Sequence, residues 1–189
     1  MVVSLGAIMS APTARKAAAV AGVLFALAAQ PVVACYFDGV MSVNWAPLHP
    51  QSLTVAMKVR EAADEGVLDA ALLDPKAAGP LGYLRATQRL RQLGMSLAES
   101  ADAMPPMTVL FVESGLWTRY VNGVPQVHVP GAEAGDIVAV TSEAVVAAML
   151  DGRLSGAEAM RRGLLALDGQ AEAVRRASQA LGWAFRVQG

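Results

Sequence analysis

The sequence predicts an α+β fold, in which a mainly antiparallel sheet is covered on one face by helices and preceded by two N-terminal helices. Apolar residues recur at helical spacing between 50 and 104, and short segments of β-branched and aromatic residues follow from 107 to 141. Helical spacing returns after 142. A chain of 189 residues with an apolar fraction of 54% is large enough to bury one core.

The first 34 residues have the layout of an export signal. They contain no acid, and Arg15 and Lys16 precede an apolar run from Ala17 to Ala29. A positive segment, a short apolar segment and a small residue at Ala34 are typical of a signal peptide, and the run is shorter than the roughly 20 residues that cross a bilayer. We therefore expect residues 1–34 to be removed and the protein to be exported.

The charge balance argues against nucleic acid as a partner. Removal of residues 1–34 takes two basic residues and no acid from a net charge of −1, which leaves −3. Binding to a duplex needs a basic surface that displaces counterions from the phosphates, whereas only 16% of this chain is charged, with both signs mixed.

Cys35 is the only cysteine in the chain, so it cannot form an internal disulfide. Residues 32–35, VVAC, resemble a bacterial lipobox, in which the cysteine becomes the first mature residue and carries lipid on its sulfur. Ordinary cleavage after Ala34 would instead leave a thiol that is free or forms a disulfide with another molecule. Both interpretations stay open, so we expect either a periplasmic protein or one tethered to the membrane through Cys35 alone.

Residues 35–82 form a predicted lead-in segment with one helix. Pro50 and Ser52 are typical of a helix start, and Gly66 is typical of its end. Four residues between them recur at helical spacing: Leu53, Ala56, Met57 and Arg60. The proline- and glycine-rich stretch 74–82 predicts a connector.

Residues 83–189 form the predicted α+β domain, which begins with the most amphipathic helix of the chain. Its apolar face consists of Leu90, Leu93, Leu97 and Ala101. Pro105 and Pro106 stop it, because proline lacks the amide hydrogen and disfavours helix in the residue before it.

Four segments from 107 to 142 predict strands: TVLFVE, LWTRYV, VPQVHV and IVAVTS. Asn122-Gly123 between the second and third strongly predicts a tight hairpin, since both residues tolerate positive φ. We expect an antiparallel meander. In the second segment Leu116, Thr118 and Tyr120 should face one side of the sheet and the alternate residues the other.

Two short helices, a strand and a final helix complete the prediction. Ser142 is placed to cap a helix that ends near Gly152, and Ser155 begins a second helix that ends at Gly163. The stretch LLALDG predicts the last strand, and residues 170–185 predict the closing helix.

Residues from about 108 to 185 resemble the sterol carrier protein type 2 family. The resemblance is carried by residues 136–169, DIVAVTSEAVVAAMLDGRLSGAEAMRRGLLALDG, in their order of strand, capped helices and strand, and the preceding strands and the closing helix follow the family's order too. The resemblance implies a curved, mainly antiparallel sheet with helices over one face and an apolar tunnel for a lipid. Together with the two capped helices, it implies five ligand-binding residues: Trp117, Met149, Leu150, Met160 and Leu164.

No catalytic pattern is found in the sequence. Ser114 lacks the preceding glycine of a hydrolase nucleophile elbow, and phosphate-loop, calcium-loop and haem-attachment motifs are absent. His49 and His128 are far apart, without further ligands at zinc spacing. We expect a protein that is not an enzyme and that uses no metal or cofactor.

Two functions therefore remain. The first is binding of an apolar small molecule or lipid by an exported protein, with or without a lipid anchor. The second is an accessory role, in which the protein docks on a periplasmic partner such as a redox or dehydrogenase component. A closed apolar cavity would favour the first, and an exposed apolar patch the second.

Overall fold

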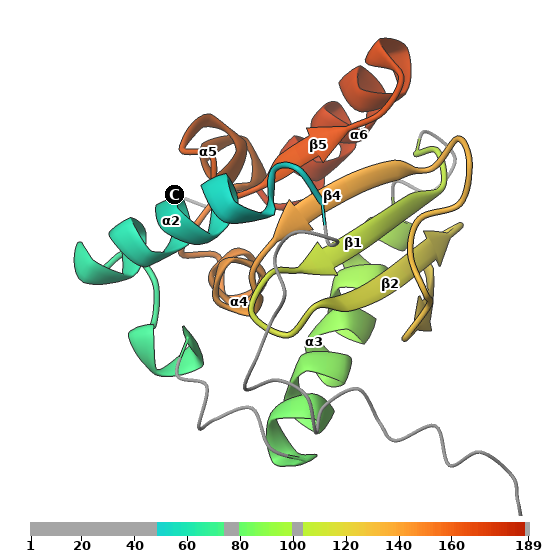
Figure 1. The fold of residues 1–189 in the computed structure, drawn as a ribbon. Helices are drawn as coiled ribbons and strands as arrows, with labels where there is room; N and C mark the ends of the chain where they lie inside the picture. Colours follow the sequence, from blue (N-terminus) through green and yellow to red (C-terminus); the bar gives the residue numbers. More distant parts are fainter. Residues whose placement is uncertain (1–48, 74–79, 100–103, 188–189) are drawn as a thin grey trace, which may run out of the picture. The chain divides into compact units, whose positions relative to one another are not determined.

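The computed structural model describes residues 49–73, 80–99 and 104–187 (Figure 1). The predicted signal peptide 1–34, Cys35 and most of the lead-in segment lie outside these residues. The described helices are α2 (Ser52–Asp64), the 3-10 helix η2 (Ala70–Leu73), α3 (Pro80–Ala98), α4 (Glu143–Leu150), α5 (Gly156–Arg161) and α6 (Ala171–Ala184). The strands are β1 (Met107–Phe111), β2 (Leu116–Val121), β3 (Val124–Val127), β4 (Ile137–Thr141) and β5 (Ala166–Asp168).

The α+β prediction is confirmed, but the sheet is mixed. Its order is β3-β2-β1-β4-β5, and β4 pairs with β1 in parallel while the other neighbours are antiparallel. The predicted meander therefore holds for β1 to β3 and is wrong for β4. The physical reason is burial: almost every residue of β4 is buried, as a strand in the middle of the sheet requires and an edge position beside β3 would not.

The prediction that helices cover one face of the sheet also needs correction. On one face Tyr120 of β2 donates a hydrogen bond of 2.8 Å to the backbone carbonyl of Leu90 in α3. On the other face Leu110 and Val140 have no exposed surface, and α2 contacts β4. Figure 1 shows α2 in front of the sheet and α3 behind it. Only β2 keeps the predicted alternation of buried and half-buried residues.

The predicted hairpin is confirmed, with φ of 52° at Asn122 and 76° at Gly123. The following strand ends earlier than predicted. The carbonyl of Trp117 accepts hydrogen bonds from the amides of both His128 and Val129, at 2.9 and 3.1 Å. Two residues after β3 therefore lie opposite a single residue of β2. This is the pattern of a β-bulge, and His128 takes a positive φ of 69° there.

Both helices before the sheet are confirmed. In α3 the predicted residues Leu90, Leu93 and Leu97 are buried, and the helix already begins at Pro80, within the predicted connector. In α2 the buried face is Val55, Val59 and Ala62, whereas Leu53 and Met57 are exposed. The buried residues of α2 belong to the same core as those of the sheet. None of the described helices is both long and apolar enough to cross a membrane.

Candidate functional site

A surface hollow of about 420 Å³ lies where the ends of α3, α4 and α6 meet. Its apolar lining residues are Met149, Leu150, Ala184 and Phe185, and its other lining residues are Ser96, Asp151, Gly152 and Arg186. Sites for small molecules usually measure roughly 300–1,000 Å³ and combine an apolar wall with a few polar groups. The hollow is therefore large enough for a small amphipathic molecule.

The sequence at the end of α4 shapes one wall of the hollow. Gly152 has a φ of 69°. Its amide donates a hydrogen bond of 3.1 Å to the carbonyl of Met149, and the amide of Arg153 donates one of 2.9 Å to the carbonyl of Ala148. This pair of bonds is a Schellman motif, in which a glycine in the left-handed region ends the helix. The turn places Asp151 and Gly152 on the rim and returns the chain to the core at Leu154.

The opposite wall is the end of α6, which is held by α5. The amide of Gly156 donates to the carbonyl of Phe185 at 2.9 Å. A Cβ at position 156 would lie 2.4 Å from the carbonyl oxygen of Leu181, so only glycine allows this approach. Phe185 is consequently fixed with 5% of its surface exposed.

The charges at the rim are unequal. Asp151 is paired with Arg153 at 3.1 Å. Arg186 donates from Nε to the carbonyl of Trp183 at 3.1 Å and lies 5.1 Å above the ring of Trp183. No carboxylate of the described residues forms an ion pair with Arg186. The rim therefore offers one guanidinium that is not in an ion pair, and the exposed ring of Trp183 lies next to this guanidinium.

The structure brings together two of the five predicted ligand-binding residues, Met149 and Leu150. Leu164, with 1% of its surface exposed, lines a smaller hollow of about 110 Å³ beside Lys58 and Arg162. Met160 is half-buried at the end of α5, and Trp117 is half-buried on β2. Neither described hollow contains all five. The sequence did not indicate Phe185 as a wall residue, because helical periodicity only assigns it to the core.

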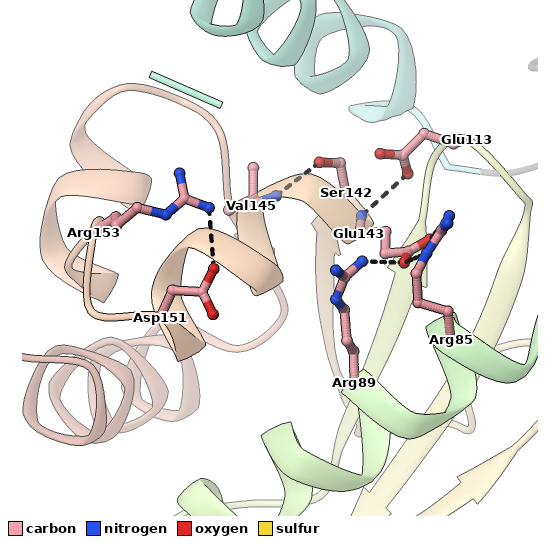
Figure 2. A network of polar contacts seen from close by, with 8 residues as sticks. All are labelled: Arg85, Arg89, Glu113, Ser142, Glu143, Val145, Asp151 and Arg153. Carbon is pink, nitrogen blue, oxygen red and sulfur yellow. Dashed lines mark hydrogen bonds and ion pairs between the residues drawn. The ribbon is translucent and has the colours of Figure 1, made fainter. Parts of the chain in front are cut away.

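A second cluster lies beyond the parallel ends of β1 and β4 (Figure 2). Glu143 is buried at the start of α4 and pairs with two arginines of α3. Arg85 donates from Nε at 2.7 Å, which raises the pKa of its guanidinium, and Arg89 donates from Nη1. Ser142 caps α4 as predicted, because its Oγ accepts from the amide of Val145 at 3.1 Å.

Glu113 faces this cluster from the turn after β1. Its Oε2 accepts a hydrogen bond of 3.4 Å from the amide of Glu143, whereas its Oε1 has no partner and no exposed surface. Burial raises the pKa of Glu113 to about 7, and the negative charge of Glu143 contributes to the increase. A carboxyl group with such a pKa can change its charge near neutral pH.

The other charged groups in the sheet are already satisfied. Arg119 donates to both carboxylate oxygens of Asp136, at 2.8 and 3.0 Å, and Thr108 donates to the same acid at 2.7 Å. Burial raises the pKa of Asp136, but these hydrogen bonds outweigh it and lower the pKa overall. We assign this cluster to the stability of the sheet.

The described residues contain no group of three histidine, cysteine or acidic side chains that could hold a metal ion. His49 pairs with Asp168 at 3.2 Å, and the ring of His128 lies 6.2 Å from that of Tyr83. The two histidines are thus in separate local contacts.

Comparison of the chain with protein-family models, curated proteins and solved structures finds no match.

Proposed function

We propose that the protein is an exported, non-enzymatic binding protein for an apolar or amphipathic small molecule, and that the hollow between α3, α4 and α6 is its binding site. The proposal rests on one observation: Met149, Leu150 and Phe185 line the same hollow of about 420 Å³. Arg186 at the rim supplies one polar contact that could orient the ligand.

Two features of the sequence support the rest of the proposal. The layout of residues 1–34 supports export, and the lipobox-like residues before Cys35 support a membrane tether. The resemblance of residues 136–169 to the sterol carrier protein type 2 family supports a related arrangement of sheet and helices and an apolar ligand. A periplasmic or membrane-tethered location follows from export.

The test is thermal unfolding of delipidated protein with a panel of sterols, quinones and fatty acids. A ligand at one hundred times its dissociation constant stabilises the folded state by about 2.7 kcal/mol, so a true ligand raises the midpoint. Leu150→Trp fills the half-exposed edge of the hollow and should abolish the increase. Met57→Trp, on the exposed face of α2, is the control and should retain it. If no member of the panel raises the midpoint, the binding role is wrong.

A second function, docking on a periplasmic redox or dehydrogenase partner, is favoured by the start of α3. Leu81 and Leu84 are 82% and 62% exposed there and lie one turn apart, so they form a small exposed apolar patch. A photo-crosslinking residue at position 84 should trap the partner in the periplasm. The same probe at position 64, an exposed polar position at the end of α2, should not.

A further inference from the structure

Most basic side chains of the described residues are neutralised by an acid. The exceptions are Arg91, Arg176 and Arg186, for which no ion pair is found within the described part of the chain. Arg91 lies on α3, Arg176 on α6 and Arg186 directly after α6. All three are exposed. Within the described residues, the arginines without an ion pair therefore lie on α3, on α6 and two residues after the end of α6.

These helices also expose large apolar side chains near the three arginines. Met95, one turn beyond Arg91 on α3, is 66% exposed. Trp183 on α6 is 47% exposed, and Val187 after α6 is 52% exposed. We define the α3–α6 surface by these residues: Arg91, Met95, Arg176, Trp183, Arg186 and Val187.

The two helices are neighbours, so their exposed residues can act together. They contact each other, and Ser96 of α3 lines the same hollow as Arg186. Met95 precedes Ser96 in the sequence, and the ring of Trp183 lies 5.1 Å from the guanidinium of Arg186, so the exposed apolar side chains belong to the ends of α3 and α6 that meet at the hollow.

Acids are scarce on these two helices. Glu172 interacts electrostatically with Arg176, but its carboxylate is hydrogen-bonded to Arg175. α3 contains no aspartate or glutamate from Pro80 to Ala98, and α6 contains none after Glu172. The chain as a whole carries a net charge of −1, so the positive charge is local.

We propose that the α3–α6 surface docks on an anionic lipid bilayer. The charges complement acidic headgroups, and tryptophan and arginine are suited to the membrane interface because each combines an apolar body with a polar end. The apolar side chains are spread over two helices, as contact with a lipid surface allows, rather than gathered in one socket. The inference goes beyond the proposed function, since docking on lipid needs no ligand in the hollow.

The test uses the mature chain, residues 35–189, with Cys35→Ser, so that neither the predicted signal peptide nor an acyl chain contributes, in sedimentation with two kinds of vesicle. One is phosphatidylcholine alone, and the other is an equal mixture of phosphatidylcholine and phosphatidylglycerol. We expect binding to the mixed vesicles only, and its loss at high salt. Arg91→Gln with Arg186→Gln should weaken binding by about fivefold for each arginine removed.

Two controls keep a change in net charge or in folding from imitating this result. Arg60→Gln with Arg161→Gln removes the same charge from α2 and α5, where both arginines are paired with acids, and should leave binding unchanged. Arg91→Lys with Arg186→Lys keeps both positive charges and should retain most of the binding to the mixed vesicles. Trp183→Phe should remove the blue shift of tryptophan fluorescence that accompanies vesicle binding.

Equal binding to both kinds of vesicle, or an equal loss in the Arg60 and Arg161 variant, would overturn the proposal. If the Cys35→Ser chain binds neither kind of vesicle, the proposal is wrong as well, and an acidic protein becomes the better candidate partner for the α3–α6 surface. Failure of the ligand panel above leaves this test unaffected, so the two proposals can fail separately.

Discussion

Glu113 and Glu143 lie beyond the parallel ends of β1 and β4, and the backbone amide of Glu143 donates a hydrogen bond to Oε2 of Glu113. The two acids differ in their partners. Glu143 holds Arg85 and Arg89, whereas Oε1 of Glu113 is buried without a partner. Burial of the Glu113 carboxyl, with the negative charge of Glu143 nearby, raises the pKa of Glu113 to about 7.

We predict that Glu113 makes the stability of the protein fall as pH rises through the range from its ordinary pKa of 4.5 to about 7. In this range the unfolded chain has lost the proton that the folded chain keeps, so each increase in pH favours unfolding. Above about pH 7 both states are ionised and the loss is complete. At about 1.4 kcal/mol per pKa unit, the total loss is at most about 3–4 kcal/mol.

The measurement is the free energy of unfolding by urea at several pH values across this range. Glu113→Gln removes the titrating group, so its free energy of unfolding should rise relative to that of the parent as pH increases. Glu99→Gln changes an exposed acid after α3 and should follow the parent at every pH. Parallel curves for the parent and Glu113→Gln would show that Glu113 does not titrate in this range.

The sequence predicts the local features of this site, such as the helix cap at Ser142. It does not predict which residues from distant segments come into contact there. Ser142 was recognised as a cap because the cap depends on neighbouring residues. The pairing of Glu143 with Arg85 spans 58 positions and depends on β4 lying beside β1. Strand order is set by burial of whole strands, which the alternation within one strand does not reveal. For the same reason the hairpin at Asn122-Gly123 was predictable and the parallel pairing was not.

We predict that Gly94→Ala destabilises the protein although alanine favours helices. A Cβ at position 94 would lie 2.6 Å from the carbonyl oxygen of Gly123, because α3 packs directly on the hairpin turn. Relief of this contact requires backbone movement, and overpacking of this kind costs typically about 1–3 kcal/mol. Urea unfolding measures the loss.

Gly182→Ala in α6 is the matched control, because a Cβ at position 182 has no heavy atom within 4 Å. It should stabilise the protein by roughly 0.5–1 kcal/mol through the helix preference of alanine. A stabilising effect of both substitutions would mean that α3 and the hairpin are not in close contact.

We predict that Glu143 and Arg89 are energetically coupled. Glu143 has 11% of its side chain exposed and Arg89 has 22%, so water screens their attraction only in part. Glu143→Gln leaves two arginines without their carboxylate and should cost about 1–3 kcal/mol. In a double-mutant cycle with Arg89→Gln, the two effects should differ from additivity by about 0.5–3 kcal/mol. Additive effects would place the pair among weak surface contacts.

The last prediction concerns Cys35 and depends on the lipobox-like residues before it. If Cys35 is acylated, intact mass of the membrane-extracted protein exceeds that of the unmodified chain beginning at Cys35, and Cys35→Ser moves the protein to the soluble fraction. A single acyl chain holds a protein only marginally, so stable anchoring predicts more than one chain in the added mass.

The fractionation has to be done at high salt, because the α3–α6 surface would retain some Cys35→Ser protein on acidic lipid at low salt. An unmodified mass would exclude the anchor. Salt-sensitive membrane binding of that unmodified protein would then be due to the arginines of α3 and α6.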